Sequence, residues 1–302
     1  MKEMNKDDVC IFIPTLDEAK NIKKLITQFK GQGYNNILVV DGHSSDGTPE
    51  IAQDAGATVI TQQGKGKGQA IKQAFKHIQA PYTIMIDGDA TYKPEEVPTL
   101  LKPLQEGIDH VMGNRFANYK EGAFTHLNMV GNKILNKMFG FAYGVWFNDI
   151  LTGYRGFNNK AIKTFELNET GFEIETEMTI ETIKKHLTVT EVPITYLRRR
   201  GDPTKLHPFK DGIKIMSTIF KLTKLHNPLF YFGIIGLLMT VTGVAVGMYI
   251  VLEWLNGIDH IPLTILATLL IMGGIQIFMF GLLSDLIVTL HHEVLRGMQK
   301  KK

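Results

Sequence analysis

The chain has 302 residues, a length that suits about two domains of roughly 150 residues each. Its 33 basic and 30 acidic residues leave a net charge of +3, which excludes a strong electrostatic field for nucleic acid. Hydrophobic residues at 44% and charged residues at 21% exclude a disordered chain. The single cysteine, Cys10, excludes an intramolecular disulfide framework and a cysteine-based zinc site, and it suits a reducing compartment.

Short apolar runs alternate with amphipathic segments in the first part of the chain. Residues 9–14 form an apolar run that ends in proline, which predicts a buried strand. Residues 16–30 have apolar side chains at helical spacing and acids near their start, which predicts a helix. The same signals predict strands at 35–42, 57–60 and 83–89 and helices at 48–55 and 68–78. Alternating strands and helices predict an α/β domain with a mainly parallel sheet.

Carboxylates stand where these predicted strands end. Asp41 closes one apolar run, and Asp87 and Asp89 close another with Gly88 between them. Ligands of such sheets bind at the carboxyl ends of the strands, and the glycine lets a ligand approach the backbone. Because Mg²⁺ and Mn²⁺ take carboxylate and phosphate oxygens together, we expect Asp87 and Asp89 to form a metal clamp for a diphosphate. The alternative interpretation of Asp87, Gly88 and Asp89 is a solvated turn. The position of these residues directly after a strongly apolar strand favours the metal clamp.

The sequences of two loops in the same predicted domain each allow a nucleotide-binding interpretation and a competing one. The loop 41–48, DGHSSDGT, could cradle a nucleoside with its amides and hydroxyls, and Ser45 or Asp46 could equally cap the following helix; both readings can hold together. The loop 64–68, GKGKG, lacks the ending of a phosphate-binding P-loop and does not follow a strand as a Rossmann loop does. Those two nucleotide-binding classes are therefore excluded.

The last quarter of the chain predicts a membrane hairpin. Residues 229–252 and 261–283 are free of charge, and at 1.5 Å per residue each span is roughly 35 Å long as a helix, enough to cross a bilayer core of about 30 Å. Before them, residues 209–227 read as an amphipathic helix on the membrane surface, or alternatively as a helix packed on the globular domain. Gly243 and Gly247 form a GxxxG pattern that could mark helix packing.

Charges flanking the spans predict the orientation. Between Lys184 and His226 there are ten Lys or Arg and three Asp or Glu residues, and the turn between the spans has Glu253 and Asp259 but no Lys or Arg. The positive-inside rule therefore places residues 1–208 and the basic tail in the cytoplasm. The start of the chain does not read as a signal peptide. We expect three parts: a globular domain at 1–208, a juxtamembrane helix at 209–227 and the hairpin with its tail at 228–302.

Six ordered motifs together resemble family 2 glycosyltransferases with a GT-A fold, and among them the dolichol-phosphate (polyprenyl-phosphate) sugar synthases. The motifs cover residues 9 to about 210 and read IPTLDEAKNI, VVDGHSSDGT, GKGKGQA, MIDGDATYKPEEVPTL, VMGNRF and NDILTGYRGF. The resemblance implies inverting transfer of a sugar from a nucleotide sugar to dolichyl or polyprenyl phosphate, with Mg²⁺ or Mn²⁺ as cofactor. The product would be a lipid-linked monosaccharide for glycan assembly, such as protein N-glycosylation.

The resemblance also implies roles for individual residues. The nucleotide is expected at Pro14, Thr15, Glu18, Asp41, Lys65, Asp87, Gly88 and Asp89, with Asp87 and Asp89 holding the metal. Asp89 and Arg115 are the expected catalytic residues, and Arg115 faces the acceptor phosphate with Asn132 and Lys133 nearby. Asp149, Arg155 and Lys205 are expected at the sugar or on a covering loop. Glu173, Glu175 and Glu177 lie either beside the sugar or on a charged helix face.

The donor is inferred from one position at which this sequence departs from the pattern of the mannosyl enzymes. Mannosyl enzymes of this kind usually carry glutamine where this sequence has Thr91, so UDP-GlcNAc or UDP-glucose is favoured over GDP-mannose. A processive polysaccharide synthase would need more spans, and a soluble nucleotidyltransferase would have no hairpin. A catalytically dead, membrane-anchored nucleotide-binding scaffold is the alternative of another class. We further expect contact with membrane lipids, a possible homo-oligomer, no nucleic-acid partner, and a prokaryotic cell membrane rather than the endoplasmic reticulum.

Overall fold

The structure, a computed structural model, describes residues 5–199 and 208–299. Two compact units are distinguished in it: the first runs to Met138 and continues over Trp146–Thr218, and the second takes Phe139–Val145 and the chain from Ile219 onward. The boundary lies inside α8 (Pro208–His226), so the helix predicted as a separate part at 209–227 is divided between the two units.

A seven-stranded sheet forms the centre of the first unit, in the order β3-β2-β1-β4-β6-β5-β7. Its strands are β1 (Val9–Thr15), β2 (Ile37–Asp41), β3 (Thr58–Thr61), β4 (Tyr82–Met85), β5 (His110–Tyr119), β6 (Arg155–Asn158) and β7 (Val189–Tyr196). All neighbouring strands are parallel except that β6 runs antiparallel to both β4 and β5. The predicted mainly parallel sheet is therefore confirmed, and the reversed strand is an addition that the sequence did not reveal.

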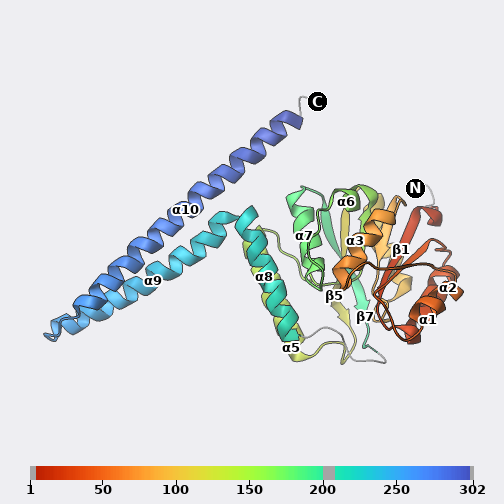
Figure 1. Ribbon diagram of the computed structural model, residues 1–302, viewed down its shortest axis with the longest axis horizontal. Coiled ribbons are helices and arrows are strands. Elements are labelled where there is room, and N and C mark those ends of the chain that lie inside the picture. The colour runs from red at the N-terminus through yellow and green to blue at the C-terminus, as the bar shows by residue number, and fades with distance from the viewer. Residues whose placement is uncertain (1–4, 200–207, 300–302) are drawn as a thin grey trace. The chain divides into compact units, whose positions relative to one another are not determined.

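Helices cover both faces of this sheet (Figure 1). Successive side chains of a strand point to opposite faces. In β1, Ile11 and Ile13 join a core with α1 (Ala19–Gly31), α2 (Thr48–Asp54) and α4 (Val97–Gln105), whereas Phe12 joins a core with α3 (Lys67–His77), α6 (Asn159–Thr164) and α7 (Ile174–Lys184). The short 3₁₀ helices η1 (Lys6–Asp8) and η2 (Pro94–Glu96) precede β1 and α4. The segments that follow the carboxyl ends of β1, β2 and β4 are loops.

Helix α8 presents two different faces. Ile215 and Ile219 are buried, together with the polar Thr218, whereas Ile213 and Met216 are 53% and 38% exposed. The apolar face that the sequence predicts for a membrane surface contains Ile213 and Met216, and both remain uncovered in the structure. A second stripe of the same helix, which contains Ile215 and Ile219, is buried, and the two alternatives for this segment stay predictions.

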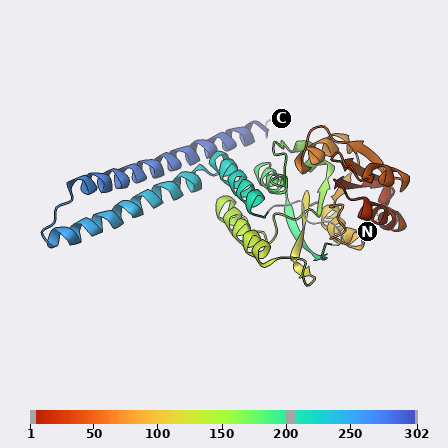
Figure 2. The same ribbon diagram turned by 60° about the horizontal axis from the view of Figure 1, so that its bottom comes forward.

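The second unit contains two long apolar helices, α9 (Pro228–Leu255) and α10 (Ile261–Gln299), which run side by side as a hairpin (Figures 1 and 2). Both are long and apolar enough to cross a membrane. The first matches the predicted span closely, whereas α10 continues past the predicted end at 283 to Gln299, so the predicted tail is largely helical. The expected hairpin is confirmed.

Glycines set the approach of the two helices. A Cβ atom on Gly236 would lie 2.5 Å from the carbonyl oxygen of Gly274, and one on Gly243 would lie 2.8 Å from the Ile271 side chain. A Cβ on Gly247 would meet no atom within 4 Å among the described residues. The GxxxG pattern is therefore used only through Gly243, inside the hairpin, and Gly247 takes no part in it.

Candidate active site

The carboxyl ends of β1 and β2 bring together residues that are far apart in sequence. Thr15 and Asp41 are direct partners in the parallel register, and the Thr15 hydroxyl donates to the Asp41 carboxylate at 3.3 Å. Asp41 is buried and also accepts from the amide and the hydroxyl of Ser44, at 2.8 and 2.5 Å. The sequence prediction that Asp41 lies at this edge is confirmed, and its carboxylate organises the loop that follows it.

Loop 41–48 is tied to the start of α1. Asp46 accepts from the amide of Ala19 at 3.0 Å and from the amide and hydroxyl of Thr48. Asp17, held at φ 47°, accepts from the amide of Ser45 at 2.8 Å. The N-cap residue of α2 is Gly47, which makes no side-chain cap bond, so the predicted cap by Ser45 or Asp46 is replaced by bonds that the first amides of α2 and α1 donate to Asp46. The nucleotide interpretation stays a prediction.

Asp87 and Asp89 follow β4, and each carboxylate contacts a cation. Asp87 lies 2.5 Å from the Lys67 ammonium, and Asp89 lies 3.2 Å from the Arg199 guanidinium. Asp89 also accepts from the amide and hydroxyl of Thr91, at 3.1 and 2.6 Å. Burial, together with the negative charge of Asp87, raises the pKa of Asp89. Gly153 packs against Asp87 so closely that a Cβ there would collide with the carboxylate.

Lys67 is one site residue that sequence reasoning missed. Its ammonium lies between Asp87 and Glu175, 2.5 and 2.6 Å from their oxygens, and these two carboxylates raise its pKa despite the opposing effect of burial. Lys65, the predicted nucleotide lysine, is exposed. Both lysines stand in the repeat GKGKG, and only the fold decides which one turns inward: Gly66 adopts φ 99° and Lys67 begins α3.

The acids of α7 are buried, so the charged-face alternative does not describe them. Glu175 is 3% exposed, and one of its oxygens has no hydrogen-bond partner among the described residues. Burial raises the pKa of this carboxyl, and the positive charge of Lys67 opposes the rise. Glu177 accepts from the amides of Asn168 and Glu169 and so holds the loop before the helix. Glu173 also has one buried carboxylate oxygen without a partner among the described residues, so these glutamates combine structural bonds with two unpaired carboxylate oxygens.

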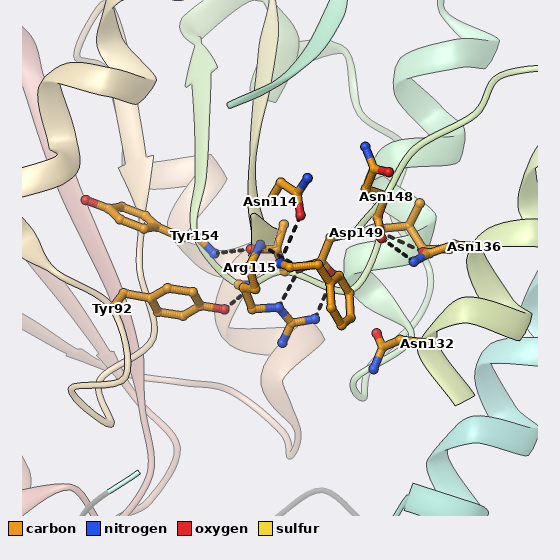
Figure 3. A network of polar contacts seen from close by, with 12 residues as sticks. Tyr92, Asn114, Arg115, Asn132, Asn136, Asn148, Asp149 and Tyr154 are labelled. Atoms are coloured by element: carbon orange, nitrogen blue, oxygen red, sulfur yellow. Dashed lines mark hydrogen bonds and ion pairs between the residues drawn. The ribbon is translucent and has the colours of Figure 1, made fainter. Parts of the chain in front are cut away.

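Arg115, on β5, is held by Asp149 (Figure 3). The guanidinium donates twice to the fully buried carboxylate, with Nε to Oδ2 at 2.6 Å and Nη2 to Oδ1 at 2.7 Å. The rings of Phe124 and Tyr196 lie 5.6 and 5.3 Å from its Cζ atom, which is cation–π range. The negative charge of Asp149 raises the pKa of Arg115 against the opposing effect of burial. Among the described residues, Nη1 makes no hydrogen bond.

The loop that carries Asp149 is clamped from two elements. Glu191 of β7 accepts from the amides of Asn148 and Asp149, at 2.9 and 2.8 Å. Asn136 of α5 (His126–Tyr143) accepts from the amide of Ile150 at 3.1 Å and donates to the carbonyl of Asn148 (Figure 3). Because these bonds fix the backbone on both sides of Asp149, they fix Arg115 through it. Neither clamp residue was predicted.

Other predicted residues have distinct positions. Asn132 donates to the carbonyl of Asn128 at 2.8 Å, and its side-chain oxygen is buried without a partner among the described residues; Lys133 is exposed. Arg155 is fully buried, and its guanidinium donates to the carbonyls of Thr152 and Ile150, which makes it a support of loop 150–155 rather than a group facing a ligand. Burial lowers its pKa to about 10. Lys205 lies outside the described residues.

The donor set suits a hard divalent cation only in part. Asp87 and Asp89 offer carboxylate oxygens, which Mg²⁺ and Mn²⁺ prefer, and the missing ligands can come from phosphate and water. Within residues 5–199 and 208–299, no group of three or more His, Cys, Asp or Glu side chains is arranged to hold a metal. Asp87 and Asp89 therefore fit a cation only as two of its ligands.

Comparison with known proteins assigns the family. Residues 10–165, just over half of the chain, match glycosyl transferase family 2. The chain belongs to glycosyl transferase family 2. Residues 227–290 of this family 2 glycosyltransferase match a second description, the GtrB C-terminal hairpin, which covers α9 and most of α10.

Relatives and solved structures agree with the assignment. The glycosyltransferase AglJ of Haloferax volcanii is 45% identical over 297 residues, which cover 97% of this chain and 98% of AglJ. A dolichyl-phosphate hexose transferase of the same organism is 32% identical, covering 74% of this chain and 96% of the relative. The glucosyl-3-phosphoglycerate synthase of Mycobacterium tuberculosis, solved with Mn²⁺, UDP-glucose and phosphoglyceric acid, superposes with a TM-score of 0.60 at 20% identity, over 71% of this chain and 79% of that one. This likeness confirms the predicted GT-A fold.

Proposed function

We propose that this family 2 glycosyltransferase transfers a sugar from a nucleotide sugar to dolichyl or polyprenyl phosphate at a membrane surface. The observation that carries the proposal is the union, in one chain, of a family 2 domain with an apolar helical hairpin of the GtrB type. A soluble acceptor gives no reason for such an anchor, whereas a lipid acceptor is confined to the bilayer. The name of the dolichyl-phosphate hexose transferase relative supports the same acceptor.

A UDP-sugar, UDP-GlcNAc or UDP-glucose, is the donor that we favour, and GDP-mannose is the alternative. The residue behind this choice is Thr91, which is 1% exposed and donates its hydroxyl to Asp89 at 2.6 Å. A threonine in this position orients the carboxylate but is too short to join a metal shell as a glutamine can. Pro14, Thr15, Glu18, Asp41 and Gly88 line the edge at which the nucleotide is proposed to bind.

Asp87 and Asp89 are the residues proposed to hold Mg²⁺ or Mn²⁺. Such a cation, when bound, neutralises charge on the diphosphate leaving group. Asp87 is kept in place by Lys67 and by the close packing of Gly153, and Asp89 by the two bonds from Thr91. The protein's contribution is therefore a pair of pre-oriented carboxylates at the end of β4.

The acceptor phosphate needs little activation. Its second pKa is about 6, so it is a dianion near neutral pH and no base must remove a proton. A phosphate oxygen forms the bond to the anomeric carbon while the bond from that carbon to the diphosphate breaks, which inverts the configuration. Arg115, whose Nη1 makes no bond among the described residues, is proposed to orient the phosphate, with Asn132 and Lys133 on α5.

A membrane assay tests the proposal. Membranes containing the full chain receive radiolabelled UDP-GlcNAc, UDP-glucose or GDP-mannose, with or without polyprenyl phosphate, and the lipids are extracted and counted. We expect labelled lipid from a UDP-sugar only when the acceptor is present, and none from the Asp89→Ala chain. Nucleotide binding without any labelled lipid from the three donors would favour the catalytically dead scaffold.

A further inference from the structure

The two carboxylates at the end of β4 have separate counter-cations. Asp87 pairs with Lys67, and Asp89 pairs with Arg199, whose other terminal nitrogen lies 2.6 Å from Glu18. Arg199 thus bridges Asp89, after β4, and Glu18, at the start of α1. Both acids belong to the edge at which a nucleotide diphosphate and its metal are proposed to bind. A cation that belongs to the protein therefore already contacts the proposed metal ligands.

The two counter-cations are held very differently. Lys67 is shared by two carboxylates at 2.5 and 2.6 Å, and it begins a helix whose Gly68 packs against Thr170. The contact of Arg199 with Asp89 is longer, 3.2 Å, against roughly 2.8 Å for a good charge-assisted bond. Its Nε is also buried without a hydrogen-bond partner among the described residues. The guanidinium is therefore incompletely satisfied by the protein and has a donor left for another anion.

A divalent cation and Arg199 compete for Asp89. Two positive charges a few ångströms apart repel strongly in a site partly shielded from water, so a free cation reaches Asp89 only if the guanidinium leaves it. Leaving is unfavourable while no other anion is present. A nucleotide diphosphate supplies that anion, and a guanidinium binds phosphate oxygens well.

We propose that Arg199 is the resident counter-cation of Asp89 in the free enzyme, that it weakens the binding of free divalent cations, and that it passes to the diphosphate when metal and nucleotide bind together. The inference rests on the proposed nucleotide-sugar function and adds a binding order to it: the metal enters with the nucleotide, not before it. Arg199 then has two successive partners, a carboxylate in the free enzyme and a phosphate in the complex.

Manganese binding tests this exchange without any transfer reaction. The full chain in detergent is titrated with Mn²⁺, and free Mn²⁺ is followed by electron paramagnetic resonance, for the wild type, Arg199→Met and the neighbouring control Arg198→Met. Without nucleotide, we expect Arg199→Met to bind Mn²⁺ about tenfold more tightly, because one competing charge-assisted pair is removed. Arg198 is exposed, so its variant should match the wild type.

Added nucleotide should reverse the order of the variants. With UDP or GDP present, Arg199→Met should no longer bind Mn²⁺ more tightly than the wild type. It should bind the nucleotide about tenfold more weakly, because the wild-type guanidinium then binds the phosphate. The variant Glu18→Gln removes the second carboxylate that holds Arg199 and leaves the guanidinium to Asp89, so its Mn²⁺ affinity without nucleotide should not rise above that of the wild type. Equal Mn²⁺ affinities of the wild type and Arg199→Met would overturn the exchange. Failure of both nucleotides to bind any variant would instead refute the proposed donor, whatever the Mn²⁺ titration shows.

Discussion

At the scale of single residues, the site is organised by charges that are buried and paired. Lys67 stands between Asp87 and Glu175, and Arg115 makes two bonds with Asp149. Replacing a whole buried pair by apolar residues is often tolerated, but removing one partner leaves an uncompensated charge in a medium of low dielectric constant. These residues therefore set the geometry of the site and make it sensitive to single substitutions.

Replacement of Lys67 tests this sensitivity. We expect Lys67→Met to lower the free energy of unfolding by roughly 3–5 kcal/mol, because Asp87 and Glu175 are left facing each other without a cation. Lys65→Met, two residues away and exposed, should change it by less than about 0.5 kcal/mol. Thermal unfolding of the detergent-solubilised chains measures the difference. Equal losses in the two variants would contradict the role of Lys67.

His110 gives a prediction about pH. It is fully buried beside Arg155, and burial, followed by the charge of Arg155, lowers its pKa well below the usual 6.5. The neutral ring can then accept from Arg155 at Nε2 and donate to Thr182 at Nδ1. Below pH 6.5 the unfolded chain takes up a proton that the folded chain does not, so stability falls as pH falls.

The size of this effect is at most about 1.4 kcal/mol for each pH unit below the unfolded pKa. Unfolding temperatures between pH 7 and pH 5 should therefore fall more steeply for the wild type than for His110→Gln, which has no proton to take up. His77→Gln, at an exposed position on α3, should keep the slope of the wild type. If the unfolding temperature of His110→Gln fell as steeply with pH as that of the wild type, His110 would not be the source of the acid sensitivity.

At the scale of elements, glycines decide how closely the backbone approaches the site. Gly153, just before β6, packs against the Asp87 carboxylate, and Gly68, in the first turn of α3, would place a Cβ 2.7 Å from the Cα of Thr170. In the hairpin, Gly236 and Gly274 bring α9 and α10 into direct backbone contact. A single methyl group at any of these positions has to displace backbone or the Asp87 carboxylate.

Gly153→Ala tests the approach at the site. Because the added methyl group collides with the Asp87 carboxylate, we expect metal-dependent nucleotide binding to fall by at least about tenfold. Gly131→Ala is the matched control, since a Cβ at this position of α5 meets no atom within 4 Å. It should stabilise the chain by roughly 0.5–1 kcal/mol through helix propensity. Calorimetric titration with UDP and Mn²⁺ compares the two, and an unaffected Gly153→Ala chain would remove Asp87 from the metal site.

At the scale of the whole molecule, the order of the parts along the chain has a topological consequence. The family 2 domain precedes α9, the acidic turn lies between α9 and α10, and the chain ends after α10. If both helices cross the bilayer, the domain and the C-terminus share one side and the turn lies on the other. The excess of Lys and Arg around the domain predicts that this side is the cytoplasm.

A tag inserted between Trp254 and Ile258 should therefore react with a membrane-impermeant reagent in intact cells. A tag at the C-terminus should react only after the cells are opened, because the positive-inside rule predicts that the basic residues that flank it stay in the cytoplasm. Labelling yields of the two tags, measured before and after permeabilisation, decide the orientation. The opposite pattern would place the transferase domain outside the cytoplasm.

The sequence alone predicted the first strands and helices of the domain, the hairpin and the family, because these depend on local signals. Apolar runs, turn residues and acids at strand ends are short-range patterns, and they located β1, β2 and β4 with Asp41, Asp87 and Asp89 at their ends. The two charge-free spans likewise predicted the hairpin, since hydrophobic length by itself decides whether a helix can cross a bilayer.

Tertiary structure decided which side chains meet. Nothing local separates Lys65 from Lys67, yet only Lys67 reaches Asp87 and Glu175, because Gly66 and the start of α3 turn it inward. Arg199 reaches Glu18 across 181 positions of sequence, and Glu191 reaches Asp149 across 42. Such pairs depend on the order of strands in the sheet, and the antiparallel β6 between β4 and β5 leaves no local signal in the sequence. Partner choice among buried charges is a property of the assembled sheet, because only there do distant residues share a place shielded from water.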